Sequence, residues 1–506
     1  MTLDKNVRVI PDTLPGIKNV RSFQAGATSS LAEMPRTPKR CGKIVSTVRE
    51  ALHRAGIRDG MTLSFHHHLR NGDLVVNMVL DIVAEMGIRD ITLAPSALFP
   101  VHEALLRHVK NGVIRTIQGS VNGPVGQAAS HGEFVAPVVL RSHGGRVRAI
   151  QTGDLHVDIA ILAAPSADQM GNVSGVIGPS ACGSLGYAFT DAQYADTVIA
   201  ITDNLLPYPV TPFSLLQTEV DWVVPVEKIG VPEKIVSGTL KITQDPMRLL
   251  IAEQVARVVE ESGLLIDGFS MQAGAGGISL AASACIRESM KKRGVRGSFI
   301  SGGITGQSVD MLKEGLFRTL LDVQSFDLEA VASLACNPNH VEMSASFYAN
   351  TAAKGCVVDM LDVAVLGATQ VDTDFNVNVN TESDGVLLHG IGGHMDTAAG
   401  AKITVIVTPL FRGRMPMVVD QVITRTTPGN TVDVVVTERG IAVNPGRKDL
   451  LDNLRGKGLP LMDIHDLKKM AENMTGVPSM PPFGERIIGI VEYRDGSIID
   501  VIRQRV

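Results

Sequence analysis

The sequence predicts an α/β protein built from two related open-sheet domains. Three observations predict this fold: strands alternate with amphipathic helices, the 506 residues exceed what one hydrophobic core usually supports, and one strand-and-loop segment occurs twice. Because ligands of open α/β sheets bind beyond the carboxyl ends of the strands, we expect the active site at the interface of the two domains.

The alternation of strands and helices begins near Lys43. Apolar residues of 43–56 follow a helical period that stops at a glycine. Met61–Phe65 is then predicted to be a strand, Leu74–Gly87 an amphipathic helix and Asp90–Pro95 the next strand. These elements form a β-α-β unit of the kind that builds a parallel sheet.

The repeated segment is Val157–Ser174, which aligns on Leu361–Asn378 without a gap. The offset is constant, because 362 − 158 and 376 − 172 both give 204. The pattern predicts a buried strand followed by a polar loop in each copy. Identical residues occupy seven pairs of positions: Asp158/Asp362, Ala160/Ala364, Leu162/Leu366, Ala164/Ala368, Asp168/Asp372, Asn172/Asn376 and Val173/Val377.

The repeat suggests how the chain is divided. Residues 1–42 are expected to be an extension that wraps or docks, 43–230 the first domain and 231–506 the second domain with a closing segment. In that closing segment, 447–476 has a helical period. Two strands follow, joined at Asp495-Gly496, which is a strong hairpin dipeptide.

The two copies differ in one carboxylate and one glycine loop. At the same offset Glu382 falls on Gly178, and the loop Gly390–Gly393 falls on 186–189, which reads Gly-Tyr-Ala-Phe. Glycine brings no Cβ, so successive N–H groups of such a loop can face an anion. We therefore predict one active site per pair of domains, in the second copy.

Acyl chemistry fits a carboxylate close to a glycine loop. The loop would hold a tetrahedral oxyanion on the N–H groups of Gly392 and Gly393, with Gly390 touching the substrate. Glu382 would attack or position the acyl group. The plain alternatives are a solvated loop glutamate and a tight strand-to-helix turn.

A second glycine loop, 273–277, invites a dinucleotide interpretation. Its last fingerprint position is Ser279 instead of glycine or alanine. We expect Gly274, Gly276 and Gly277 to touch the pantetheine or phosphate portion of an acyl carrier, with a plain turn as the alternative.

Five further positions are candidates for substrate contacts or for structural roles. His66–His68 do not predict a metal site, because consecutive residues of an extended chain cannot all point one way. We expect His67 to line the cleft. Asn376 is a candidate substrate residue, although its recurrence in both copies favours a role in the loop. Arg70, Arg412 and Arg414 are candidate cations for a carboxylate substrate.

Composition excludes several classes of protein. The formal net charge of −5 gives no reason to expect nucleic acid or an anionic membrane as a partner. Five scattered cysteines without a CxxC spacing argue against disulfides and zinc and favour the cytoplasm. We expect no signal peptide and, because no apolar run reaches about 18 residues, no membrane span.

Several of these motifs carry a family resemblance. QVDTDFNVN, TESDG and GIGGHMDTAAGA resemble the glutamate-and-glycine region of the CoA-transferase superfamily, and VDIAILAAPSADQMGNVSG resembles the matching strand of the other half. VTERGIAVNPGR resembles the C-terminal segment of that superfamily. Over nearly its whole length, including the N-terminal extension and the ending GERIIGIVEYRDGSIIDVIRQ, the chain is similar to the α subunits of citrate lyases. TESDG departs from the shorter Glu-x-Gly of many relatives.

This resemblance implies a pair of CoA-transferase-like domains and a transferase activity. It implies exchange of acetate for citrate on the thioester of a phosphoribosyl-dephospho-CoA group carried by a γ (acyl carrier) subunit, with a β subunit cleaving the product. No cofactor would be bound by this chain itself, and homo-oligomerisation within the complex is expected. In the superfamily a glutamate at the Glu382 position attacks the thioester, whereas citrate lyase transferases are classed as working through a ternary complex.

Other functions stay open at this point. An acetate CoA-transferase or an acetyl-CoA hydrolase could use the same fold. A non-catalytic scaffold is a different class, against which the intact Glu382 and glycine loop argue. A sugar-phosphate isomerase would not need the glutamate.

Overall fold

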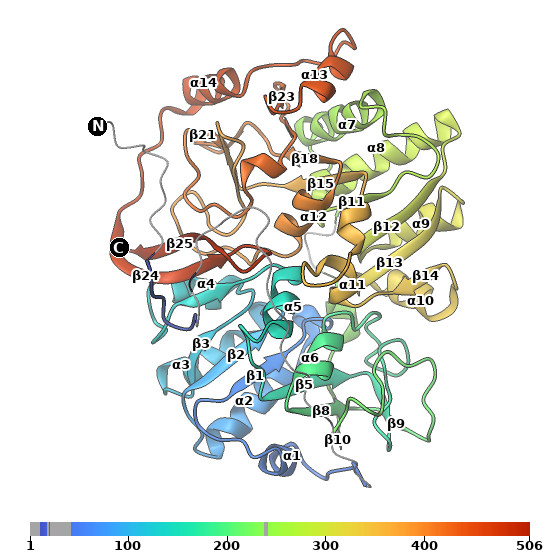
Figure 1. Ribbon diagram of the computed structural model, residues 1–506, viewed down its shortest axis with the longest axis vertical. Coiled ribbons are helices and arrows are strands. Elements are labelled where there is room, and N and C mark those ends of the chain that lie inside the picture. The colour runs from blue at the N-terminus through green and yellow to red at the C-terminus, as the bar shows by residue number, and fades with distance from the viewer. Residues whose placement is uncertain (1–10, 18–19, 21–41, 237–240) are drawn as a thin grey trace.

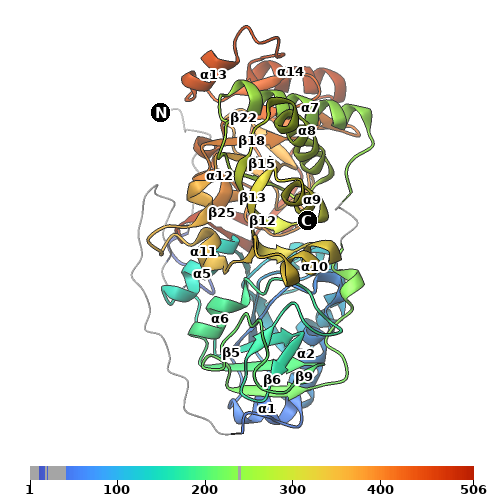
Figure 2. The ribbon, with the colours of Figure 1, turned by 90° about the vertical axis from the view of Figure 1, so that its right-hand side faces the viewer.

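Two parallel sheets organise the chain, one in each half of the sequence (Figure 1). The computed structural model describes residues 11–17, 20, 42–236 and 241–506. Most of the predicted N-terminal extension therefore lies outside the described residues. In Figure 2 the two halves stand one above the other, with α5 (His143–Gln151) and α11 (Ala345–Ala349) at their boundary.

The first sheet has the strand order β10-β8-β5-β1-β2-β3, and every neighbouring pair is parallel. Its strands are rich in Val, Ile and Ala and are buried on both faces, as parallel sheets require. The strands are β1 (Thr62–Phe65), β2 (Ile91–Pro95), β3 (Ile114–Ile117), β5 (Ile159–Ala164), β8 (Thr197–Thr202) and β10 (Trp222–Pro225).

The second sheet repeats that order and extends it at both edges. Its order is β14-β13-β12-β11-β15-β18-β22-β23, and β23 pairs antiparallel with β22. Reading β22-β18-β15-β11-β12-β13 gives the counterpart of the whole first sheet. The strands are β11 (Met271–Ala273), β12 (Gly297–Ile304), β13 (Phe317–Ser325), β14 (His340–Glu342), β15 (Val363–Gly367), β18 (Ile403–Val407), β22 (Val434–Val436) and β23 (Ile441–Val443).

The repeated segments occupy equivalent places. β5 begins at Ile159 and β15 at Val363, an offset of 363 − 159 = 204. Each is followed by a small three-stranded sheet, β7-β6-β9 or β17-β16-β21. The predicted repeat and the parallel-sheet α/β class are therefore confirmed. These smaller strands are β6 (Ser166–Asp168), β7 (Val173–Ser174), β9 (Leu205–Leu206), β16 (Gln370–Asp372), β17 (Val377–Asn378) and β21 (Val418–Val419), and β19 (Phe411–Arg412) pairs with β20 (Met415–Pro416).

Helices cover these sheets and bury their apolar faces against them. α7 and α8, for example, pack together over β15 and β18. The remaining helices are α1 (Val48–Arg54), α2 (Val75–Glu85), α3 (Leu106–Lys110), α4 (Gly123–Ser130), α6 (Ala188–Tyr194), α7 (Pro246–Glu261), α8 (Gly277–Arg293), α9 (Gly306–Lys313), α10 (Leu328–Cys336), α12 (His394–Gly400), α13 (Lys448–Leu454) and α14 (Ile464–Thr475), with 3₁₀ turns η1 (Arg70–Gly72), η2 (Pro100–Leu105), η3 (Pro232–Lys234), η4 (Val357–Met360) and η5 (Gly429–Thr431).

Two predicted helices differ from the structure. The first begins at Val48 and not near Lys43, because Val45 N–H donates to Val223 O at the edge of the first sheet. The helical segment 447–476 is divided into α13 and α14, because Gly456 and Gly458 between them adopt positive φ.

The end of the chain returns to the first half. β24 (Phe483–Glu492) and β25 (Ile498–Arg505) form the predicted hairpin, with Gly496 at φ +88° in its turn. β24 also pairs parallel with β4 (Val138–Leu140), so the hairpin ties the end of the chain to the first half (Figure 1). Leu14 of the N-terminal extension packs on this small sheet.

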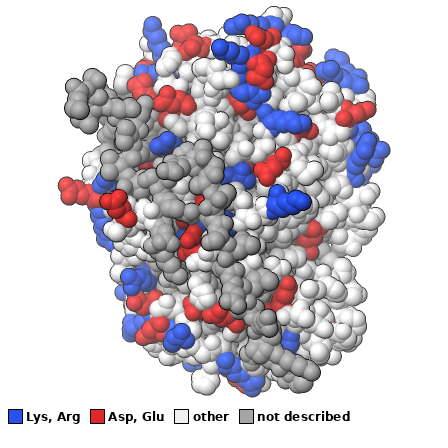
Figure 3. Space-filling view, viewed as in Figure 1, with Lys and Arg blue, Asp and Glu red and all other residues white. Residues whose placement is uncertain are grey.

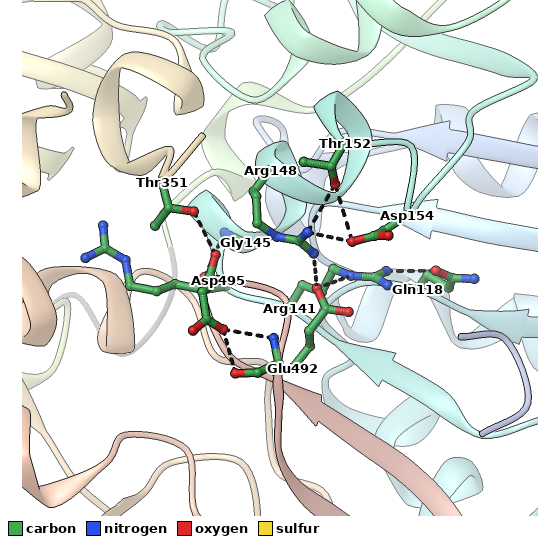
Figure 4. Close-up of polar contacts among 12 residues, drawn as sticks. Gln118, Arg141, Gly145, Arg148, Thr152, Asp154, Thr351, Glu492 and Asp495 are labelled. Carbon is green, nitrogen blue, oxygen red and sulfur yellow. Dashed lines mark hydrogen bonds and ion pairs between the residues drawn. The ribbon is translucent and has the colours of Figure 1, made fainter. Parts of the chain in front are cut away.

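A buried ion cluster fixes the hairpin in place (Figure 4). The Glu492 carboxylate accepts hydrogen bonds from Arg141 Nε at 2.9 Å and from Arg148 at 2.7 Å. Arg148 also donates to Asp154. The side chains of Glu492, Arg141 and Arg148 are almost completely buried. Glu492 bridges two buried guanidinium groups, and Asp154 supplies the second negative charge.

We expect Glu492→Gln to lower the free energy of unfolding by about 3 kcal/mol, because breaking a buried pair leaves uncompensated charge inside the protein. Urea unfolding followed by circular dichroism measures this change. Glu485→Gln, at an exposed position of the same strand, is the matched control. Equal stability of the two variants would contradict the assigned role of Glu492.

Candidate active site

Glu382 lies at the tip of a hairpin between β17 and α12. Glu382 N–H donates to Val386 O at 2.8 Å, and Gly385, at φ +87°, donates back to Glu382 O at 2.9 Å. Asn380 closes the base of the hairpin by donating to His389 O. The Glu382 side chain is exposed and makes no ion pair or hydrogen bond to any residue that the structure describes.

The hairpin rests on the first half of the chain. Leu387 N–H donates to Ser130 Oγ in α4 at 2.8 Å. A Cβ on Gly126, one turn earlier in α4, would lie 2.9 Å from Leu387 O, so only glycine allows this approach. The position of Glu382 therefore depends on packing between the halves.

The glycine loop Gly390–Gly393 directly precedes α12. None of its four backbone N–H groups donates to an acceptor within the described ranges. Gly392 has φ +64°, which favours glycine. Free successive N–H groups form an anion-binding concavity.

Close packing explains two of the glycines in this loop. A Cβ on Gly390 would overlap the hydroxyl of Ser120, and a Cβ on Gly393 would overlap that of Tyr348. Gly392 O accepts a hydrogen bond of 2.9 Å from His143 N–H, at the start of α5. The loop of the second half is thus inserted into the first half.

Asp396 in α12 stabilises the contact between the glycine loop and α5. Its carboxylate accepts hydrogen bonds from Ser142 Oγ at 2.8 Å and from Gly144 N–H at 2.9 Å, and so satisfies the first turn of α5. Burial raises the pKa of Asp396, although Arg494 and the Gly144 N–H oppose that rise. The carboxylate is completely buried.

The equivalent loop of the first half makes the reciprocal contact. Gly186 O accepts a hydrogen bond of 2.7 Å from Ala345 N–H in the second half. Tyr187, which falls on Ile391 in the repeat, stacks on His67 with ring centroids 4.6 Å apart and lies 4.4 Å from His143. The two loops therefore meet at a buried aromatic cluster of His67, His143 and Tyr187.

Both histidines of this cluster are held neutral. Burial, assisted by Arg146, lowers the pKa of His143 to about 3. Burial and then the neighbouring His143 and Arg70 lower the pKa of His67 well below its ordinary value. His67 Nδ1 contacts Ser96 Oγ at 2.6 Å. The cluster therefore brings polar, uncharged groups to the glycine loop.

The lowered pKa of His143 predicts a pH-dependent stability. Unfolded histidine titrates near pH 6.5, so between that pH and about 3 the unfolded chain binds a proton that the folded chain does not. Stability is full above this window and falls by about 1.4 kcal/mol per pH unit within it. We expect His143→Gln to reduce the slope of unfolding free energy against pH by that amount between about pH 6 and 4, measured by urea titration. His465→Gln, exposed in α14, should leave the slope unchanged.

His66 and His68 point away from the aromatic cluster. His66 Nε2 contacts Asp191 at 3.0 Å, and His68 Nε2 contacts Ala163 O at 2.8 Å. The predicted alternation of this triplet is therefore observed. A separate surface group, His156 with Asp158 and Asp196, has metal-ligand atoms within 4.8 Å of one another, but it lies at the amino ends of β5 and β8, outside this site.

The second glycine loop lies within the second half, where strand β11 ends. Gly274 lines a cleft at the carboxyl ends of β11 and β12, together with Phe326. A Cβ on Gly276 would meet open space, whereas one on Gly277 would lie 2.9 Å from Lys241 O. Gly274 thus borders that cleft, and close packing requires glycine at position 277.

Three predicted substrate residues lie elsewhere. The Asn376 amide donates to Asp372 and accepts from Gly429 N–H, as Asn172 does with Asp168 and Gln217 in the other copy. Both ends of the Asn376 side chain are used within its loop, so the structure gives it a structural role. Arg412 and Arg414 are exposed on the β19–β20 hairpin and do not join the cluster.

Comparisons with known proteins agree along the chain. The family model described as citrate lyase, alpha subunit, matches residues 41–505. The citrate lyase alpha chain of Klebsiella pneumoniae is 51% identical over 467 residues, covering 92% of each chain. The chain belongs to the citrate lyase α subunit family. The family predicted from the sequence, and with it a citrate transferase subunit, is confirmed.

Solved structures of two other proteins resemble this structure. The crystal structure of the putative α subunit of citrate lyase from Streptococcus mutans, in complex with citrate, shares 46% identity and covers 99% of each chain, with a TM-score of 0.95. A Pseudomonas malonate decarboxylase in complex with malonate shares 17% identity and a TM-score of 0.64 over 86% of each chain. This second likeness shows the fold alone. No helix among the described residues has the length and apolar character needed to cross a bilayer.

Several residues of the candidate site were not predicted from the sequence. His143, Tyr187 and Tyr348 were not candidates. The repeat contained a signal for one of them, because Tyr187 occupies the loop equivalent to Gly390–Gly393. His143 joins the site through a contact between the halves, and Tyr348 through a contact between distant segments of the second half, and local patterns encode neither.

Proposed function

We propose that the chain transfers the acyl-carrier thioester from acetate to citrate at the interface of its two halves. The observation that carries the proposal is the row of N–H groups at Gly390–Gly393, which have no acceptor in the described part of the chain and face the cluster of His67, His143 and Tyr187. Family membership supplies the reaction. Citrate in the Streptococcus mutans relative supports the acceptor acid.

The chemistry uses two substrates at one oxyanion site. A carboxylate oxygen of citrate attacks the acetyl carbonyl, and the N–H groups of Gly392 and Gly393 hold the resulting oxyanion. The carrier thiolate leaves, which gives a mixed acetyl-citryl anhydride. The thiolate then attacks the citryl carbonyl and acetate departs, so that atoms and charges balance.

Glu382 is the proposed catalytic carboxylate of this site. Its side chain has no structural partner among the described residues, and its hairpin is supported from the other half by Ser130. A carboxylate that stabilises nothing in the fold is free to act on the acyl group or on the carrier thiol. These two routes give different results in the experiments on Glu382 below.

We infer that the acyl group arrives on a carrier and not as free acetyl-CoA. A γ subunit would present its phosphoribosyl-dephospho-CoA arm along the cleft at Gly274, with Gly276 open beside it. A β subunit would cleave the citryl product. The described cysteines are all unpaired, which favours a reducing cytoplasm. More than one copy of the chain is expected in the complex.

The test is acyl exchange by the purified chain with its acetylated carrier. Mass spectrometry of the carrier should show conversion of acetyl to citryl thioester on addition of citrate, with release of one acetate. Free acetyl-CoA with water, acetate or citrate is supplied in parallel. Use of water as the acceptor would indicate a hydrolase, and the use of acetate but not citrate would indicate an acetate CoA-transferase. A lack of exchange with every acceptor would indicate a scaffold.

A further inference from the structure

Arg70 is a buried arginine in an unfavourable backbone conformation at the interface of the halves. It opens the turn η1 with φ +50°, one of three positive-φ residues other than glycine in the described parts of the chain. Only 8% of the residue is exposed. Such conformations cost about 1–3 kcal/mol and are concentrated at functional sites.

Aromatic rings from both halves hold its guanidinium group. Cζ lies 5.3 Å from the ring centroid of Phe99 in the first half and 4.6 Å from that of Phe326 in the second. Stacking on rings occupies the face of a guanidinium and leaves its N–H edges for hydrogen bonds. Phe326 also lines the cleft at Gly274, so Arg70 adjoins the proposed carrier path.

The charge of Arg70 has no counter-charge among the described residues. Its Nε is buried without a hydrogen-bond partner, and it makes no ion pair to any residue that the structure describes. Burial lowers its pKa to about 10, so it remains cationic at neutral pH. By contrast, the neighbouring buried Arg146 donates to both oxygens of Asp191. Burying an unpaired charge is expensive, so an anionic ligand would gain directly from this site.

We propose that Arg70 binds a carboxylate of citrate that does not react and thereby makes the enzyme prefer citrate to acetate as acceptor. This inference rests on the proposed function. The only carboxylate of acetate is the one exchanged on the thioester, whereas citrate keeps two carboxylates after one has reacted. A cation that binds a spare carboxylate therefore acts on citrate alone. Arg70 is a specificity residue and does not touch the reacting atoms.

The first experiment separates the two acids with Arg70→Met. Labelled acetate exchanging into the acetylated carrier reports the reaction without a spare carboxylate, and citrate exchange reports the reaction with two. We expect the KM for citrate to rise roughly 10²-fold, as on truncation of one partner of a buried charge pair. Acetate self-exchange should change less than about threefold. Arg412→Met, exposed on the β19–β20 hairpin, is the matched control and should alter neither KM.

Two outcomes would overturn the inference. One is an unchanged KM for citrate. The other is an equal loss of citrate and acetate exchange, which would place Arg70 in the common chemistry. If the wild-type chain exchanged neither acid, the proposed function would fail and the binding test below would still judge Arg70.

The second experiment measures binding without turnover. Citrate should raise the melting temperature of the wild-type chain and of Arg412→Met, but not that of Arg70→Met. Arg70→Lys keeps the charge and loses the planar fork, so it should retain a smaller shift. Without ligand, Arg70→Met should be at least as stable as the wild type, because a buried unpaired charge is removed. An equal citrate shift in wild type and Arg70→Met would refute the assignment.

Discussion

Glu382→Gln is expected to lower acyl exchange by at least about 10²-fold, with no measurable change in the free energy of unfolding. The carboxylate is exposed at a hairpin tip and has no partner within the described ranges, so the fold does not depend on its charge. A group that moves a proton in the transition state contributes about 10²–10⁴-fold. Exchange is measured by mass spectrometry of the carrier at saturating citrate.

The size of the loss distinguishes the two routes. A fall of about 10²–10⁴-fold, with turnover insensitive to hydroxylamine, indicates that Glu382 serves the carrier thiol in a ternary complex. A fall approaching 10⁶-fold, with wild-type enzyme inactivated by hydroxylamine during turnover, indicates that Glu382 itself carries the acyl group. Asp384→Asn, exposed in the same hairpin, is the control. Near-normal exchange by Glu382→Gln would show that another residue is responsible.

Most of the fold could be predicted from local sequence patterns. The repeat at offset 204 correctly placed β5 and β15, because a buried parallel strand reads as an apolar run whatever surrounds it. The turn at Asp495-Gly496 was equally local, since its glycine must adopt positive φ. The partner of that hairpin was not predictable, because β4 lies more than 300 residues earlier in the chain.

The candidate site was likewise predictable only where a local sequence pattern marks it. The glycine loop is visible in the sequence, since close approach and free N–H groups both require glycine. What surrounds it comes from the other half, namely His143, Tyr187 and Ser120. Burial also separates Arg70 from Arg412 and Arg414, which the sequence presents as equals.

The distribution of surface charge does not mark the position of the site. Figure 3 shows basic and acidic side chains interspersed on one face of the molecule, as the small net charge suggested. The electrostatics that matter are buried. They involve the neutral histidines, the unpaired Arg70 and the two arginines that share Glu492.

Gly393→Ala is expected to reduce turnover by about 10²–10³-fold, the usual loss when one oxyanion donor is displaced. The added Cβ would overlap the Tyr348 hydroxyl, which itself accepts a hydrogen bond from Gln272 at 2.7 Å. The loop must then shift, and its N–H groups no longer point toward the oxyanion. Turnover per folded molecule is measured by acyl exchange, with the folded fraction taken from urea unfolding.

Two further variants separate a displaced oxyanion site from simple overpacking. Gly400→Ala, at the other end of α12, introduces a similar overlap with Val358 O. It should cost about 1–3 kcal/mol of stability and leave the turnover of the folded enzyme nearly intact. Combining Gly393→Ala with Tyr348→Phe removes the clashing hydroxyl and should restore much of the lost turnover. If Gly400→Ala lost as much turnover as Gly393→Ala, or the double variant recovered none, the N–H groups of this loop would not be the oxyanion donors.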